Sequence, residues 1–270
     1  MPEPSSLPLF AANTDPGPSF AELLRQVAPH QLPGANIQHP ITADIPHGTT
    51  IVAIRSATGV VMAGDRRATA GMMIASRRIE KVFPADDFSG VAIAGAAGPA
   101  VELVRLFQLQ LEHYEKIEGE LLSLEGKANQ LAMLVRQNLP AAMTGFAVIP
   151  LFAGYDERRR MGRVFSYDVT GGKYEEADFQ TNGSGGIHAR NWIKALWQEG
   201  MSRDETVDLA LRALFAAADE DTATGGPDLI RGIFPTVAVI SADGFSTVPD
   251  DDVARRSEVL YGGREEGSGL

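Results

Sequence analysis

Two adjacent threonines, Thr49 and Thr50, follow a single glycine, Gly48, and open the strand-like run TTIVAIRS. If the chain is cut between Gly48 and Thr49, Thr49 gains a free α-amine beside its own hydroxyl. An α-amine has an ordinary pKa of about 7.7–8.0, so near neutral pH much of it is neutral and can accept the hydroxyl proton. One residue then supplies both nucleophile and base, and histidine is unnecessary.

A threonine nucleophile of this kind needs charged neighbours. A lysine that stays charged lowers the pKa of the amine and stabilises the developing alkoxide, and a buried carboxylate is needed to hold that lysine. The candidates are Lys81, at the start of the strand-like run KVFPAD, and Asp65, at the end of GVVMAGD. Taken singly, each could equally be a solvated surface charge, so further residues have to support the assignment.

Other catalytic chemistries find little support in the sequence. The chain has no cysteine, which excludes disulfides, thiolate zinc sites and cysteine nucleophiles. Three of its five histidines precede Thr49, and it contains neither an H-E-x-x-H motif nor a G-x-S-x-G elbow. The Gly-rich stretch NGSGGIHAR lacks the lysine of a phosphate loop and is interpreted as a tight turn that packs a helix against a strand. We therefore expect no metal and no cofactor.

The residues before the Gly48–Thr49 junction differ from those after it. Residues 1–48 hold nine of the 16 prolines, and within them only FAELLRQVA indicates a short helix. We expect such a stretch to form no hydrophobic core of its own, so it is either a disordered tail or a removable pro-segment. It has no basic region followed by a long apolar run, and a secretory signal is not expected.

The pattern after Gly48 is strands, two helices, strands, two helices and strands. Turn signals, rather than single helices, separate consecutive strands, and this favours antiparallel sheets. The uncharged run at residues 137–155 is interrupted by Pro140, Gly145 and Pro150, and it favours a buried strand over a membrane span. Ser202 and Glu205 form a capping box that predicts a helix start. The sequence thus predicts an α+β fold, a four-layer αββα sandwich of two antiparallel sheets between helix layers.

Composition limits the class of protein. An apolar fraction of 44% allows a sizeable core. The net charge of −11 argues against non-specific binding to nucleic acid or to anionic membranes, which both require basic patches. Lack of cysteine fits a cytoplasmic location. The charged, Gly-rich residues 251–270 are expected to form a flexible C-terminal tail.

Six fragments, in this order and at these spacings, resemble the catalytic β-subunits of 20S proteasomes, most closely the bacterial, actinobacterial type. They are HGTTIVAIR, GVVMAGDRRATAG, EKVF, AIAGAAGPA, TNGSGG and EDTATGG. The resemblance spans residues 46 to about 250. It implies an N-terminal nucleophile hydrolase fold for a catalytic domain over residues 49–250, and a pro-segment, residues 1–48, removed by autocatalytic cleavage at Gly48–Thr49.

The resemblance also implies catalytic roles for the matched residues. Thr49 is the nucleophile of a threonine endopeptidase, with Asp65 and Lys81 as the charged pair that tunes it. The backbone N–H of Gly95 is the oxyanion-hole donor. Family members often carry serine where this chain has threonine at position 224, and the hydroxyl is retained. The polar groups that support proton transfer around the amine are Ser184, Asp221 and Thr224.

Substrate-binding positions follow from the same resemblance. The backbones of Thr69 and Ala97 hold the peptide as an added strand. The pocket for the residue before the cut, the S1 pocket, involves Ala68, Ile93 and Ala97, with Ile79 and Phe83 nearby. These residues are apolar or small, so we expect cleavage after apolar residues.

The resemblance further implies an assembly. The expected partners are other copies in a homo-heptameric β-ring, α-subunits that complete a four-ring barrel, and an ATPase ring that delivers unfolded or tagged proteins. Two alternatives remain. One is the related ATP-dependent threonine protease of two six-membered rings, which also starts with two threonines but has almost no pro-segment. The other is a non-catalytic structural β-ring subunit, which typically lacks the Gly-Thr junction or the lysine.

Overall fold

The computed structural model describes residues 19–28 and 48–265. The chain divides into two units, Met1–Thr42 and Ala43–Leu270. The first contributes one described helix, α1 (Phe20–Val27), which the side chain of Ser19 caps by accepting a hydrogen bond from the amide of Glu22 at 3.3 Å. The short helix expected at FAELLRQVA is therefore confirmed. The rest of the expected pro-segment, apart from Gly48, lies outside the described residues.

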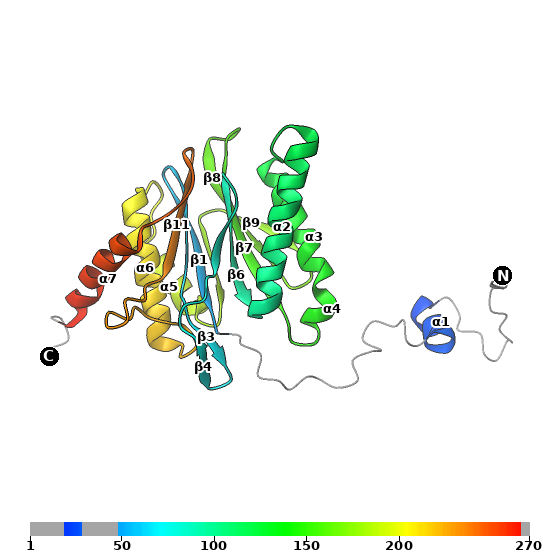
Figure 1. The fold of residues 1–270 in the computed structure, drawn as a ribbon, viewed down its shortest axis with the longest axis horizontal. Helices are drawn as coiled ribbons and strands as arrows, with labels where there is room; N and C mark the ends of the chain where they lie inside the picture. Colours follow the sequence, from blue (N-terminus) through cyan, green and yellow to red (C-terminus); the bar gives the residue numbers. More distant parts are fainter. Residues whose placement is uncertain (1–18, 29–47, 266–270) are drawn as a thin grey trace. The chain divides into compact units, whose positions relative to one another are not determined.

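Two five-stranded antiparallel sheets form the centre of residues 48–265 (Figure 1). The first sheet has the order β10-β1-β2-β11-β12, with β1 (Thr50–Ser56), β2 (Gly59–Gly64), β10 (Phe179–Gly183), β11 (Thr236–Ser241) and β12 (Gly244–Thr247). The second has the order β5-β6-β7-β8-β9, with β5 (Val82–Asp86), β6 (Ser89–Gly95), β7 (Val148–Asp156), β8 (Met161–Tyr167) and β9 (Lys173–Glu176). A separate hairpin joins β3 (Ala68–Ala70) to β4 (Met73–Ser76).

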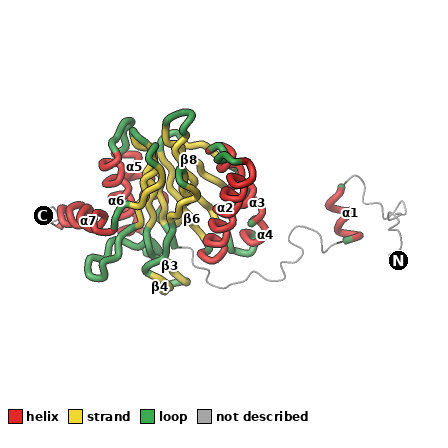
Figure 2. Tube along the Cα trace, turned by 45° about the horizontal axis from the view of Figure 1, so that its top comes forward, coloured by secondary structure: helices red, strands yellow, loops and turns green. Residues whose placement is uncertain are grey.

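Helices cover the outer face of each sheet (Figures 1 and 2). On the second sheet lie α2 (Ala97–Glu118) and α3 (Leu124–Gln137), followed by the short α4 (Leu139–Ala142). On the first sheet lie α5 (Gly186–Leu196) and α6 (Arg203–Glu220). The capping box of Ser202 and Glu205 starts α6, as expected from the sequence. No helix in the described part of the chain is long and apolar enough to cross a membrane, and most of the uncharged run at 137–155 forms α4 and the buried strand β7.

Three apolar clusters hold the four layers together. Successive residues of a strand point to opposite faces of its sheet, and in β1 both faces are buried. Val52 and Ile54 pack in the cluster that includes residues of α5 and α6. Ile51 and Ala53 pack in the cluster between the two sheets, and a third cluster lies between the second sheet and α2 and α3. The predicted αββα sandwich is confirmed.

Asp250–Glu265 form a helix, α7, within the stretch 251–270 that the sequence predicts as a flexible tail, and residues 266–270 lie outside the described residues. Val253 is buried in the cluster of the first sheet and α6. The guanidinium of Arg256 pairs with the carboxylates of Asp204 and Asp208 on α6, both at 2.8 Å. Leu260 packs partly buried against the same cluster, so apolar and ionic contacts together hold this charge-rich helix.

Candidate active site

The start of β1 is the point around which the site is built. Because β1 and β2 are antiparallel neighbours, the end of β2 lies beside the start of β1, and Asp65 directly follows β2. The amide of Thr50 donates to Oδ1 of Asp65 at 2.7 Å, and the amide of Asp65 donates to the carbonyl of Thr50 at 3.1 Å. Backbone pairing thus places the Asp65 carboxylate next to Thr49.

Lys81, the residue before β5, completes a buried ion pair with Asp65. Its Nζ lies 2.5 Å from Asp65 Oδ1, and only 4% of the lysine side chain and none of the aspartate side chain is exposed. The ammonium also donates to the carbonyls of Arg67 at 2.7 Å and of Gly48 at 3.4 Å. Burial lowers the pKa of Lys81, although the carboxylates of Asp65 and Asp221 act against that shift. A lysine in this state gives up a proton more readily than one in water.

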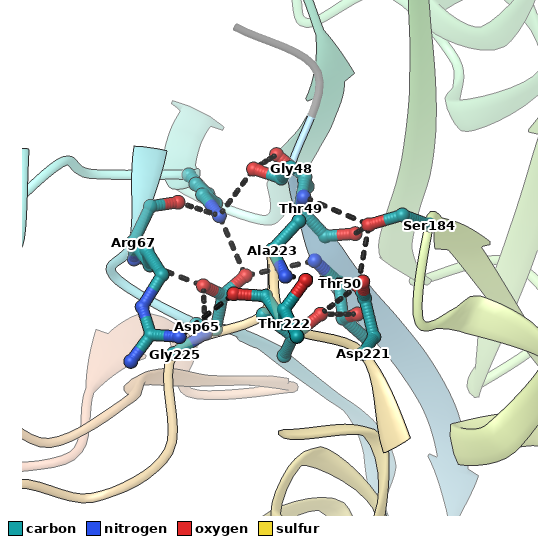
Figure 3. A network of polar contacts seen from close by, with 12 residues as sticks. Gly48, Thr49, Thr50, Asp65, Arg67, Ser184, Asp221, Thr222, Ala223 and Gly225 are labelled. Carbon is teal, nitrogen blue, oxygen red and sulfur yellow. Dashed lines mark hydrogen bonds and ion pairs between the residues drawn. The ribbon is translucent and has the colours of Figure 1, made fainter. Parts of the chain in front are cut away.

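Thr49 lies between this ion pair and a second polar group (Figure 3). Its hydroxyl donates to the carbonyl of Gly48 at 2.6 Å, and its amide donates to Oγ of Ser184 at 3.3 Å. Ser184 lies just beyond β10, the other neighbour of β1, and its hydroxyl donates to Asp221 Oδ2 at 2.5 Å. The nitrogen that cleavage would turn into an amine therefore already contacts a hydroxyl that is held by a carboxylate.

Asp221 ends α6 and accepts several hydrogen bonds. Thr224 donates its hydroxyl to Asp221 Oδ2 at 2.6 Å, and the amide of Ala223 donates to Oδ1 at 3.1 Å. Burial raises the pKa of Asp221, but the hydrogen bonds from Ser184, Thr224 and Ala223 outweigh it, and the pKa lies below its ordinary value. Asp221 is therefore a carboxylate throughout the neutral pH range.

The loop after α6 also holds Asp65. The second carboxylate oxygen of Asp65 accepts from the amides of Gly225 at 2.8 Å and Arg67 at 2.9 Å. The guanidinium of Arg67 donates to the carbonyl of Thr222 at 2.8 Å, so the same loop is fixed from both sides. Sequence reasoning missed Arg67 and Gly225, because their contribution to Asp65 is through backbone amides that every non-proline residue carries.

A small cavity lies beside Thr49. It is lined by the predicted residues Ala68, Ile79, Ile93, Gly95 and Ala97, together with Gly48, Thr49, Glu80, Lys81 and Ala100. Glu80 was not expected, but its carboxylate is occupied by Arg66 at 2.5 Å and by the hydroxyl of Thr236 at 2.8 Å. The wall is therefore mainly apolar.

Two substrate-binding predictions have different outcomes. The hydroxyl of Thr69 lies next to Gly48, because a methyl group built on Gly48 would come within 2.6 Å of it. Phe83 does not line the cavity and packs instead against the cluster of the second sheet and α2 and α3.

Gly95, at the cavity, has φ of +113°, and a side chain there would meet the carbonyl of Ala147 at 2.1 Å.

Within residues 19–28 and 48–265, no group of three or more histidine, aspartate or glutamate side chains is arranged to hold a metal ion.

Known proteins are similar to this chain over most of its length. The profile of the family described as "Proteasome subunit" matches residues 45–230. A "Proteasome subunit beta" of Acidimicrobium ferrooxidans is 58% identical over 254 residues, which cover 94% of this chain and 92% of that protein. A "Proteasome subunit beta" of Streptomyces griseus is 54% identical over 247 residues, which cover 90% of this chain and 88% of that protein.

Proposed function

Because the chain belongs to the proteasome subunit family, we propose that it is the proteolytic β-subunit of a 20S core and that Thr49 is its nucleophile. The observation that carries this proposal is the position of Thr49. Its hydroxyl and the buried Lys81 ammonium both contact the carbonyl of Gly48, while its nitrogen contacts Ser184. The family assignment also supports assembly into a proteasome core with α-subunits.

Self-cleavage would be the first reaction of this site. The Thr49 hydroxyl oxygen attacks the carbonyl carbon of Gly48, the C–N bond breaks, and the nitrogen takes up the proton, which leaves an ester on the hydroxyl. Water then hydrolyses the ester to free the hydroxyl and the Gly48 carboxylate. Lys81, 3.4 Å from the Gly48 carbonyl oxygen, stabilises the negative charge that develops there. Residues 1–48 are released as the pro-segment.

Peptide hydrolysis would then use the same atoms. The free amine of Thr49 accepts the hydroxyl proton, with Ser184 and Asp221 holding that amine in place. The oxygen attacks the scissile carbonyl, and an ester forms as the amine product leaves with the proton. Hydrolysis of the ester restores the threonine. We assign the oxyanion to the amide of Gly95, and one such donor contributes about 2.7–4 kcal/mol in comparable sites.

The cavity beside Thr49 supports a preference for apolar residues before the cut. Ala68, Ile93 and Ala97 line it, and the carboxylate of Glu80 is paired with Arg66. We therefore expect peptides with an apolar residue at this position to be cleaved faster than peptides with a basic one. Faster turnover of the basic peptides would show that Glu80, or another acid, reaches the substrate.

The finer details of the assembly belong to the proposal. We infer a homo-heptameric β-ring capped by α-rings, a cytoplasmic location, and an ATPase ring that supplies unfolded or tagged substrates. Counting the subunits per ring in electron micrographs distinguishes this assembly from the alternative enzyme with six-membered rings. The non-catalytic alternative is disfavoured because Lys81, paired with Asp65, and the Thr49 hydroxyl both contact the Gly48 carbonyl.

The central test is the substitution Thr49→Ala in the full chain, assembled with α-subunits. The nucleophile is then absent, so intact mass should show that residues 1–48 remain attached, and peptide hydrolysis should be lost. Thr247→Ala, at an exposed threonine of β12, is the control and should be processed and active. Processing by an assembly made only of the Thr49→Ala chain, or peptide hydrolysis by it, would overturn the proposal.

A further inference from the structure

Thr50, the residue after the proposed nucleophile, makes side-chain contacts that its place in strand β1 does not require. Thr50 is fully buried, and its hydroxyl oxygen lies 2.6 Å from the hydroxyl oxygen of Thr224, a residue 174 positions further along the chain. Thr224 is fully buried as well. A strand residue is held by its backbone, so a buried hydroxyl at this position needs another reason.

The direction of these hydrogen bonds follows from the carboxylate at their end. The Asp221 carboxylate is ionised and can only accept hydrogen bonds. Thr224 therefore donates its single hydroxyl proton to Asp221 Oδ2. The bond between the two threonines must then be donated by Thr50. The result is a directed chain from Thr50 through Thr224 to Asp221, and it ends on the carboxylate oxygen that also accepts from Ser184.

The same residue is bonded to the other side of the site through its backbone. The Thr50 amide donates to the Asp65 oxygen that also accepts from Lys81, and the Thr50 carbonyl accepts from the Asp65 amide. Thr50 therefore contacts the ion pair with its backbone and the Asp221 group with its side chain, while Thr49 lies between them (Figure 3).

The hydroxyl pair of Thr50 and Thr224 is closely packed. The backbone of Gly185 lies against it, since a methyl group built there would come within 2.4 Å of the Thr50 hydroxyl and 2.7 Å of the Thr224 hydroxyl. A valine at position 50 fits the volume of threonine but would leave the Thr224 oxygen without its donor. Loss of one donor in a buried chain weakens the next hydrogen bond in it.

We propose that Thr50 is a positioning residue, whose side-chain hydroxyl polarises Thr224 and thereby orients the Asp221 carboxylate and Ser184 on the nitrogen of Thr49. This inference rests on the proposed function, because it concerns proton transfer at the Thr49 amine. It gives the second threonine a role in the reaction as well as in the strand.

The test compares Thr50→Val and Thr50→Ser in the full chain assembled with α-subunits, with an apolar reporter peptide as substrate. Thr50→Val should lower kcat about tenfold, the equivalent of ~1.4 kcal/mol in activation energy, with KM within about twofold. It should also move the acidic limb of the pH–rate profile up by about half a pH unit, because the Thr49 amine is the base on that limb and its pKa rises when the nearby Asp221 carboxylate is less well hydrogen-bonded. Thr50→Ser keeps the donor and should restore both.

Other charged groups that act on Asp221 are His188 of α5, which lowers its pKa, and Lys81, and both are retained in every variant. Thr224→Val should reproduce the phenotype of Thr50→Val, and the double variant should lose no more than the worse single one. Thr206→Val is the matched control, because Thr206 is fully buried and its hydroxyl bonds a backbone carbonyl of α6 at 2.7 Å, away from the site. It should leave kcat and the pH profile unchanged.

Several results would overturn the proposal. Thr50→Val with the kcat and pH profile of wild type would do so, and so would equal losses in Thr50→Ser, additive losses in the double variant, or an equal loss of kcat in Thr206→Val. Thr50→Ala is the second hydroxyl-free variant if the valine chain fails to fold, and a failure of both would make the hydroxyl a structural requirement only. Thr49→Ala distinguishes failure of this inference from failure of the proposed function: if that variant stays active, the proposed function itself fails.

Discussion

At the scale of single residues, the site depends on two opposite charges that are both removed from water. Replacing Lys81 by methionine leaves the Asp65 carboxylate buried without its counter-ion, which costs about 3–5 kcal/mol of stability in comparable pairs. Self-cleavage should fall by about 10²–10³-fold or more, since a donor to the oxyanion that develops on Gly48 is lost. Peptide hydrolysis should fall as well, because the charge that lowers the pKa of the Thr49 amine is gone. Denaturant unfolding, intact mass and peptide assays measure the three effects.

The double variant Asp65→Asn/Lys81→Met separates charge burial from catalysis. Both charges are gone, so much of the stability should return, whereas activity should not. Recovery of activity together with stability would mean that Lys81 serves only to neutralise Asp65.

The neighbours of Gly48 leave no room for a side chain at this position. A methyl group on it would come within 2.5 Å of the Ala223 side chain and 2.6 Å of the Thr69 hydroxyl. Gly48→Ala should therefore displace the carbonyl that Thr49 attacks and slow self-cleavage about 10²-fold, as small misplacements do. Time-resolved intact mass of freshly assembled protein measures this rate. Once cleaved, the variant should hydrolyse peptides like wild type, because Gly48 has left, and a lasting deficit would contradict this explanation.

Sequence reasoning reached those residues whose side chains would carry the proposed chemistry. Thr49, Asp65, Lys81 and Ser184 have hydroxyl or charged groups that a threonine nucleophile requires, and the structure brings them together. It did not reach the backbone amide of Gly225 or the inward-facing hydroxyl of Thr50 in its strand. Neither group is visible before the fold is known.

At the scale of elements, a buried arginine ties the outer helix to the second sheet. Arg163 of β8 is only 3% exposed and pairs with Glu125 of α3 at 2.7 Å, Asp156 of β7 at 3.0 Å and Glu175 of β9 at 2.6 Å. A hydrogen bond from Lys173, together with Arg163, lowers the pKa of Glu125, and Arg163 itself lowers that of Glu175. Burial raises the pKa of Asp156, but the Arg159 amide and Arg163 more than offset it.

These shifts predict how stability depends on pH. A carboxylate with a lowered pKa in the folded state contributes stability that is present above its ordinary pKa, 3.8 for aspartate and 4.5 for glutamate, and lost as the pH falls through the folded value. Arg163→Met should thus be less stable than wild type at pH 6, with a difference that shrinks as the pH falls below about 4.5. Urea unfolding at several pH values measures it. A difference that stays constant from pH 6 to pH 3 would contradict the prediction.

The elements themselves were predictable where one face is apolar and the other is not. The order of strands and helices and the αββα layers followed from such patterns, as did the capping box of Ser202. The helix α7 was not predicted, because its apolar contacts are few, the buried Val253 and the partly buried Leu260, and its ionic anchor, Arg256, has its partners on α6, far away in the sequence. Tertiary contacts, rather than a local pattern, stabilise this helix.

At the scale of the whole molecule, the outer helices of the second sheet carry apolar side chains that the chain leaves in solvent. On α2, Leu106, Leu109 and Ile117 are 42%, 62% and 66% exposed, and their spacing places them along one stripe of the helix. Met133 of α3 is 49% exposed. A stripe of this kind is typical of a surface that another protein covers, and we infer that an α-subunit covers it in the proteasome core.

Leu109→Asp tests this assignment of the surface. The carboxylate would be buried without a partner in the assembly, so complexes with α-subunits should form poorly, whereas the stability of the isolated chain should change by no more than about 0.5 kcal/mol. Native mass spectrometry of co-expressed subunits measures the assembly, and urea unfolding measures the stability. Val259→Asp, at a residue of α7 that is 76% exposed, is the control for introducing the same charge elsewhere, and it should assemble normally. If Leu109→Asp assembles as well as wild type, the α2 stripe is not the surface that meets the α-subunits.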